Sequence, residues 1–134
     1  MTPLVDTNVV SELVRRSPNR GVLSWFHLHP AFAISAITLE ELVYGVDRLD
    51  GGRRARMRDW LDALLATGAE VVPVDDRIAQ TAGRLRADRD REGRPASQGD
   101  MLIGATAVVT RRVIVTRNVR DFVGLGLRVV DPFV

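Results

Sequence analysis

Short apolar runs alternate along the chain with longer segments whose apolar residues recur at helical spacing. The runs are typical of buried strands, and the longer segments are typical of amphipathic helices. Because strands separated by helices pair in parallel through right-handed crossovers, the sequence predicts an α/β fold with a central parallel β-sheet and helices on both faces. The first predicted strand ends at Leu4–Val5, and the others cover residues 31–35, 70–74, 113–115 and 127–130.

The helical segment after the second strand predicts a core stripe formed by Leu39, Leu42, Val43 and Val46. The pair Gly51-Gly52 is expected to close this helix. A second helix then follows before the third strand, and an exposed helical pair of this kind is a natural place for self-association. The predicted helices include residues 9–14, 21–28, 39–46, 53–66, a helix from Asp75 or Asp76 to 87, and one from Gly99 or Asp100 to 109.

The length of 134 residues fits a single domain, residues 1–134, and 46% hydrophobic with 27% charged residues is an ordinary globular composition. The absence of cysteine excludes disulfides, zinc–thiolate sites and thiol nucleophiles. The N-terminus lacks the basic and apolar regions of a signal peptide, and no apolar run approaches the roughly 20 residues of a membrane span. We therefore expect a cytoplasmic protein.

All 19 basic residues are arginine, although the formal net charge is only +2. Arginine binds phosphate through a planar fork, so two clusters between residues 53–58 and 84–94 are candidates for contacts with a polyanion. Acidic residues are interleaved with both clusters, as they are on a solvated helix face. The sequence favours the solvated face and leaves the polyanion contact as an alternative.

Asp6 lies where the first strand is expected to stop and a helix to start. In open α/β sheets, ligands bind at the carboxyl ends of the strands, so an acid at this junction faces the expected site. The alternative is that Asp6 only caps the following helix.

Two further acids lie where helices begin or flank the predicted core. Glu41 has the small residues Thr38 and Gly45 as its neighbours on the helix, which leaves room for a ligand, whereas Glu40 lies on the opposite, wetted flank. Asp100 stands in the first turn of its helix, where we expect the macrodipole to lower the pKa of the carboxylate. Complementing that helix end is the structural alternative for Asp100.

Asn118 and Asp121 follow the fourth predicted strand directly, and either one is placed to hydrogen-bond the turn. If the strand ends converge, Asp6, Glu41, Asp100 and one of these two side chains gather at one edge of the sheet. Crowded carboxylates repel one another unless a cation or protons neutralise them.

The ion that suits such a site is Mg²⁺ or Mn²⁺, because the available ligands are oxygens. The only histidines, His27 and His29, lie on different faces of their helix and are not expected to share a metal. Mg²⁺ and Mn²⁺ polarise phosphoryl oxygens and activate water, so the matching reaction is phosphodiester hydrolysis.

Four blocks of the sequence, taken together and in order, resemble the successive motifs of PIN-domain proteins. Their spacing is similar to that of VapC-type toxins of bacterial toxin–antitoxin pairs, and in particular to the FitB-like branch. The blocks are Val5–Asn8, Ser35–Gly45, Asp100–Ala107 and Val115–Phe122.

The resemblance implies a PIN-like three-layer fold and a Mg²⁺-dependent endoribonuclease that a cognate VapB-type antitoxin holds inactive and that commonly forms homodimers. It implies that Asp6, Glu41 and Asp100 bind the metal, with Thr7 and Thr116 as polar support. Many relatives carry a fourth acid after the last core strand, and here the fourth group remains open between Asn118 and Asp121. Gly104 stands where alanine is usual, a change that we expect to be tolerated.

Other classes fit the sequence less well. Phosphoacceptor receiver domains and aspartyl-phosphate phosphatases also place an acid after the first strand, but both normally need a catalytic lysine, and this chain has no lysine. A dinucleotide-binding role lacks the glycine-rich turn after the first strand. A catalytically inert PIN-like module that binds an antitoxin or RNA remains the alternative to the enzyme.

Overall fold

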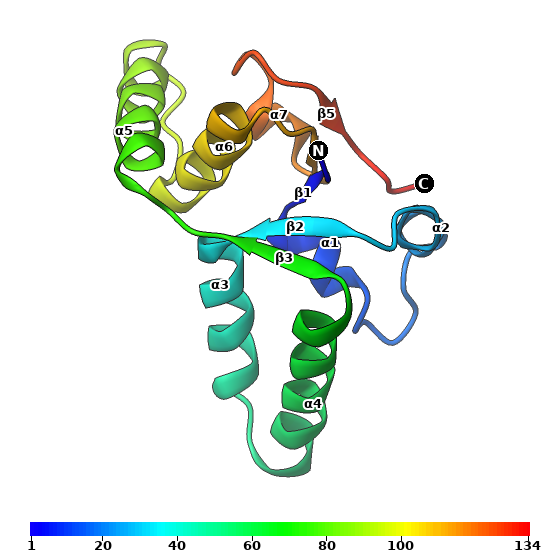
Figure 1. Cartoon of the computed structure of the whole chain (residues 1–134). Coiled ribbons are helices and arrows are strands. Elements are labelled where there is room, and N and C mark those ends of the chain that lie inside the picture. The colour runs from blue at the N-terminus through cyan, green and yellow to red at the C-terminus, as the bar shows by residue number, and fades with distance from the viewer.

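The computed structural model describes residues 1–134 and contains one five-stranded sheet in the order β3-β2-β1-β4-β5 (Figure 1). Every neighbouring pair of strands is parallel, as the sequence predicts. The central strand β1 lies between β2, which follows it in the chain, and β4, which the chain reaches only after crossing back over the sheet. The strands are β1 (Leu4–Val5), β2 (Phe32–Ser35), β3 (Ala69–Val72), β4 (Ile114–Val115) and β5 (Val129–Val130).

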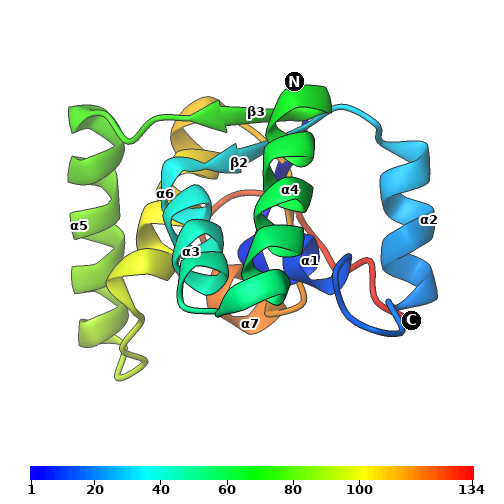
Figure 2. The same ribbon diagram turned by 90° about the horizontal axis from the view of Figure 1, so that it is seen from below.

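Seven helices flank the sheet and give the fold three layers (Figures 1 and 2). The helices are α1 (Thr7–Glu12), α2 (Arg20–Leu28), α3 (Ala36–Asp47), α4 (Gly51–Thr67), α5 (Asp76–Arg91), α6 (Gln98–Thr110) and α7 (Val119–Phe122). Helices α5, α6 and α7 lie on one side of the sheet in Figure 1, and the α3–α4 pair projects from the other side together with α1.

Neighbouring residues of each strand enter different cores because successive side chains of a strand point to opposite faces. Leu4 and Ile114 join the core beneath α5 and α6, whereas Val5 and Val115 join the core formed with α1, α2, α3 and α4. The strands β1, β2 and β4 are therefore buried on both faces, which explains why they read as continuous apolar runs.

Three predictions about the local structure are wrong. Gly51 and Gly52 begin α4 instead of closing α3; Gly51 has a φ of 57°, a left-handed conformation that favours glycine. Val43 is 40% exposed and does not belong to the core stripe, although Leu42 and Val46 do. The short helix α7, which contains Asp121 and Phe122, was expected to be a turn.

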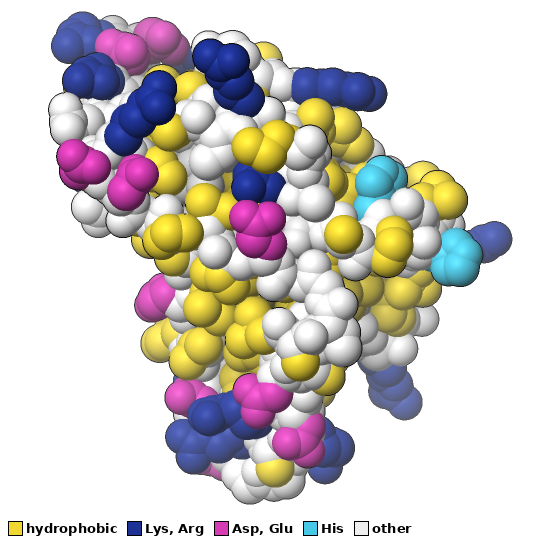
Figure 3. All heavy atoms as spheres, viewed as in Figure 1, with side chains coloured by type: hydrophobic (Ala, Val, Ile, Leu, Met, Phe, Trp, Pro, Cys, Tyr) yellow, Lys and Arg dark blue, Asp and Glu magenta, His cyan; other side chains and the backbone are white.

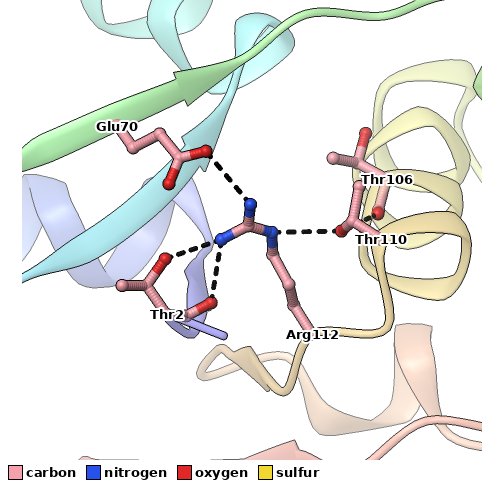
Figure 4. Close-up of polar contacts among 5 residues, drawn as sticks. All are labelled: Thr2, Glu70, Thr106, Thr110 and Arg112. Atoms are coloured by element: carbon pink, nitrogen blue, oxygen red, sulfur yellow. Dashed lines mark hydrogen bonds and ion pairs between the residues drawn. The ribbon is translucent and has the colours of Figure 1, made fainter.

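A buried arginine connects the amino-terminal edge of the sheet to α6 (Figure 4). The Arg112 guanidinium donates hydrogen bonds to the carbonyl and hydroxyl oxygens of Thr2, at 3.1 and 2.6 Å, and to the Thr110 hydroxyl at 3.1 Å. It also pairs with Glu70 at 3.1 Å. Because Thr2 precedes β1 and Glu70 lies in β3, this one side chain holds three segments at the edge opposite the carboxyl ends of the strands.

Most of the arginine-rich surface is mixed with acids. In Figure 3, basic and acidic side chains alternate over α5 and over the tip of the α3–α4 pair. Arg91 pairs with Asp88, and Arg58 pairs with Asp47, as expected for solvated helix faces. Arg89 is an exception in its cluster because it is only 5% exposed. None of the helices is sufficiently long and apolar to cross a membrane.

Candidate active site

The carboxyl ends of β1, β2 and β4 lie side by side. The strands β2 and β4 lie on opposite sides of β1, so the direction of the strand order reverses at β1. In parallel α/β sheets this switch point forms a crevice between the strand ends, where ligands bind. Asp6 directly follows β1, Thr116 directly follows β4, and Ser35 ends β2 and caps the helix that carries Glu41. The topology therefore brings together residues that are far apart in the sequence.

Asp6 is the buried centre of this site, with 4% of its surface exposed. Its carboxylate caps α1 by accepting the Thr7 N–H at 2.8 Å, as the structural alternative expected. Its other oxygen accepts from the Thr116 hydroxyl at 2.8 Å and from the Asn8 side-chain amide at 3.1 Å. Capping is thus only part of what the carboxylate does.

Burial raises the pKa of Asp6 to about 6 even though the hydrogen bonds from Thr116 and Thr7 act to lower it. The negative charges of Asp100 and Glu41 raise the pKa of Asp6 further. Asp100 and Glu41 therefore both lie within electrostatic range of Asp6.

A hydrogen bond from Thr7 connects Glu41 to the site. The Thr7 hydroxyl donates to Glu41 Oε1 at 2.7 Å and lies 3.0 Å from the Thr38 hydroxyl, so Glu41 is oriented by the first residue of α1. Glu40 has no comparable contact with α1. Glu41 is itself exposed, and together with Gly45 it lines a hollow between α1, α3 and α4.

Asp100 lies in the first turn of α6, which Ser97 caps by accepting the Asp100 N–H at 3.0 Å. The prediction that the helix end lowers its pKa is wrong. Partial burial of the carboxyl raises the pKa of Asp100, the Ser97 hydroxyl acts to lower it, and the charge of Asp121 raises it again. Desolvation is therefore the largest influence on the pKa of this carboxyl.

The two candidates for the fourth group lie on either side of the start of α7. Asp121 is close enough to Asp100 to raise the pKa of that carboxyl. Asn118 makes no side-chain hydrogen bond to α7, and its backbone N–H donates to the Thr116 hydroxyl at 3.0 Å. Of the two, Asp121 is the one whose charge acts on another acid of the site.

Two features of the site were missed by the sequence reasoning. The Asn8 side chain links the first and last motifs, because its amide donates to Asp6 and its oxygen accepts the Arg117 N–H at 3.1 Å. Its position two residues after the acid was the available signal. The absence of a side chain at Gly104 does not create space for a ligand. Leu125 and Phe122 occupy that space, because a Cβ at residue 104 would lie 2.9 Å from Leu125 and 3.4 Å from the Phe122 ring. Gly104 instead allows Phe122, and with it α7, to pack against α6.

The donor set suits a hard divalent cation, since every candidate ligand is a carboxylate, hydroxyl or amide oxygen. The charges of Asp100 and Glu41 raise the pKa of Asp6, and the charge of Asp121 raises that of Asp100, a repulsion that a cation would relieve. No three acidic or histidine side chains are already arranged to hold an ion. The residues therefore fit such an ion by the chemistry of their oxygens.

The fold has three layers, a parallel sheet and four acids near the carboxyl ends of its central strands. These features define a class of α/β protein whose acidic site lies where the strand order reverses. Residues 4–123 match the PIN domain, and the chain belongs to the PIN-domain family.

The chain is similar in sequence to curated members of that family. It is 31% identical to the VapC ribonuclease Y4jK of Sinorhizobium fredii over 135 residues, covering 97% of this chain and 96% of the relative. It is 30% identical to the toxin FitB of Neisseria gonorrhoeae over 138 residues, covering 97% of both chains.

Solved structures of the family share the fold. The FitAcB crystal structure from Neisseria gonorrhoeae superposes with a TM-score of 0.86 at 28% identity over 98% of both chains. The DNA-bound VapBC complex from Salmonella typhimurium superposes with a TM-score of 0.84 at 29% identity, covering 98% of this chain and 99% of that one.

Proposed function

We propose that this chain is a divalent-metal-dependent endoribonuclease and the toxin component of a VapBC-type toxin–antitoxin pair. The observation that carries the proposal is the position of Asp6, a buried carboxylate at the end of β1 that interacts with Asp100 and Glu41 from two other elements. The names of relatives, among them a VapC ribonuclease and a tRNA(fMet)-specific endonuclease VapC of Shigella flexneri, support the same activity.

Asp6, Glu41 and Asp100 are the residues that would hold Mg²⁺ or Mn²⁺, and Asp121 is our choice for the fourth acid because of its interaction with Asp100. When bound, such an ion polarises a phosphoryl oxygen and activates water for in-line attack.

The chain itself supplies the orientation of these carboxylates. Thr116 after β4 and Asn8 in α1 fix the carboxylate of Asp6, and Thr7 in α1 fixes that of Glu41.

An antitoxin partner is proposed because the solved relatives include complexes named FitAB and VapBC. A homodimer is proposed from the α3–α4 pair, which exposes Val43 and Tyr44 on its surface, the latter at 64%. Exposed apolar side chains that lie together on one helical pair are a common feature of self-association surfaces.

The test is cleavage of single-stranded RNA by the purified chain with Mg²⁺ or with EDTA. We expect cleavage only with the metal, and a loss of about 100-fold or more in Asp100→Asn, which removes charge without changing side-chain shape. Glu41→Gln is expected to lose activity, while its neighbour Glu40→Gln, which lies outside the site, serves as the matched control.

Expression without an antitoxin gives the test in cells. The proposal predicts growth arrest by the wild-type chain and none by Asp6→Ala. Equal effects of the two proteins on growth, together with unchanged RNA cleavage in Asp100→Asn, would favour a catalytically inert binding module and contradict the enzyme.

A further inference from the structure

An open hollow of about 510 Å³ lies between the loop that joins α5 to α6 and the turn that leads from β4 into α7. Figure 2 shows α7 and this loop on the same side of the molecule as the first turn of α6. The charged residues that line the hollow are four arginines, Arg89, Arg94, Arg117 and Arg120, and two acids, Asp121 and Asp131.

The four arginines differ in what they already contact. Arg89 is buried and donates to the Val123 carbonyl at 2.8 Å, so it holds the chain after α7 against α5. Arg94 pairs with Glu92 at 2.9 Å. Arg117 and Arg120 are exposed and have no carboxylate partner. Two guanidinium groups are therefore free to bind an anion from solution.

Arg117 has no carboxylate partner, but other contacts hold it in place. Its guanidinium carbon lies 4.5 Å from the centre of the Phe133 ring, and its backbone N–H donates to Asn8. Ordering this side chain in advance lowers the entropy that a ligand must overcome to bind it.

The hollow borders the acidic site. Asp121 belongs to both, since it lines the hollow and its charge acts on Asp100. Asn118, another lining residue, donates its N–H to the hydroxyl of Thr116 that in turn contacts Asp6. A polyanion that placed one phosphate at the acids would present its next phosphate near these arginines.

We propose that this hollow binds the sugar–phosphate backbone of a single RNA strand next to the phosphodiester that is cleaved, with Arg117 and Arg120 contacting the phosphates. The inference rests on the proposed nuclease function and adds the path of the substrate. The acids repel a polyanion, and the neighbouring guanidinium groups offset that repulsion at the point of entry.

Binding is measured by fluorescence anisotropy of a labelled single-stranded RNA oligonucleotide in the Asp100→Asn background, at several salt concentrations. Each phosphate contact contributes about 0.7 to the slope of log Kd against log salt for a single strand. We expect the added pair Arg117→Gln and Arg120→Gln to raise Kd about 10-fold and to reduce the slope by about 1.4.

The matched control removes two exposed arginines of α5 that lie outside the hollow, Arg77→Gln and Arg84→Gln, and is expected to bind RNA like the parent. Arg120→Gln alone removes a side chain that makes no hydrogen bond or ion pair, and it is expected to reduce the slope by about 0.7 without altering the fold.

Unchanged Kd and slope in the double variant would overturn the inference while leaving the nuclease proposal intact, provided that the wild type cleaves RNA. The inference is also wrong if the double variant keeps its RNA affinity but loses binding of a poly-glutamate peptide, since the hollow would then recognise protein carboxylates. Failure of the wild type to cleave RNA, together with failure of the Asp100→Asn parent to bind it, contradicts both proposals.

Discussion

The Thr116 hydroxyl donates a hydrogen bond of 2.8 Å to Asp6 Oδ2 and so joins the residue after β4 to the residue after β1. Both side chains are buried. The same hydroxyl accepts the Asn118 N–H at 3.0 Å. One oxygen atom therefore ties the first acid of the site to the turn that leads into α7 and Asp121.

Replacing this hydroxyl by a methyl group tests its role. Thr116→Val keeps the shape of the side chain but removes the donor to Asp6, so we expect a loss of about 1.5–3 kcal/mol in unfolding free energy. Because the lost hydrogen bond stabilises the carboxylate, the pKa of Asp6 is expected to rise further, and the acidic limb of the pH–rate profile for RNA cleavage moves to higher pH. Urea unfolding and the pH–rate profile measure the two effects.

Thr116→Ser is the control for this change, since it retains the hydroxyl. It is expected to recover the pH–rate profile of the wild type. A profile that is the same in the valine, serine and wild-type proteins would show that the hydroxyl does not act on Asp6.

The raised pKa of Asp6 predicts how stability depends on pH in the absence of divalent cations. The folded state holds its proton up to about pH 6, whereas the unfolded state releases it near 3.8. The folded state thus binds more protons between these values, and the free energy of unfolding falls as the pH rises through this window and is lowest above it. A shift of this size corresponds to roughly 3 kcal/mol.

The measurement is urea unfolding in EDTA between pH 4 and 7.5, compared with Asp6→Asn, which cannot ionise at this position. The wild type is expected to lose stability relative to Asp6→Asn as the pH rises, and Glu40→Gln is expected to behave like the wild type. A difference between wild type and Asp6→Asn that is constant with pH would contradict the raised pKa.

Arg112 offers a change that affects the fold without touching the site. Arg112→Met leaves apolar bulk but removes the hydrogen bonds to Thr2 and Thr110 at the opposite edge of the sheet, so we expect a loss of about 2–4 kcal/mol in unfolding free energy. Below the unfolding transition, kcat/KM for RNA cleavage is expected to stay unchanged. Thermal unfolding and cleavage kinetics on the same preparation check both statements.

Arg112→Lys is expected to be intermediate, because an ammonium group cannot reproduce the planar set of donors. A large loss of kcat/KM at full folding in Arg112→Met would show that the amino-terminal edge is coupled to the acids.

The central strands β1, β2 and β4 could be predicted from the sequence because they are apolar and each stops at a polar residue, namely Asp6, Ser35 and Thr116. The same rule placed Asp6 at the end of β1, where the structure has it. Helix geometry alone distinguished Glu41 from Glu40 as the candidate site residue. In the structure, Glu41 accepts a hydrogen bond from the Thr7 hydroxyl. These predictions needed only local spacing and the parallel topology.

What could not be predicted depends on packing between distant segments. The pKa of Asp100 follows from burial by the rest of the chain, which the helix end by itself does not indicate. Phe122 and Leu125 pack closely over Gly104 from another part of the chain, which the expectation of a tolerated change from alanine did not indicate. Gly51 was interpreted as a helix stop because a glycine signals a break without indicating whether a helix ends or begins there.

The most direct test of the account is a titration of the wild-type protein with Mn²⁺ at pH 7.5, followed by electron paramagnetic resonance of the free ion. The account predicts saturable binding that weakens at least about 10-fold in both Asp6→Asn and Asp100→Asn and is unchanged in Glu40→Gln. Equal affinity in all four proteins, or no binding by the wild type, would contradict the claim that acids from separate elements meet to hold a cation.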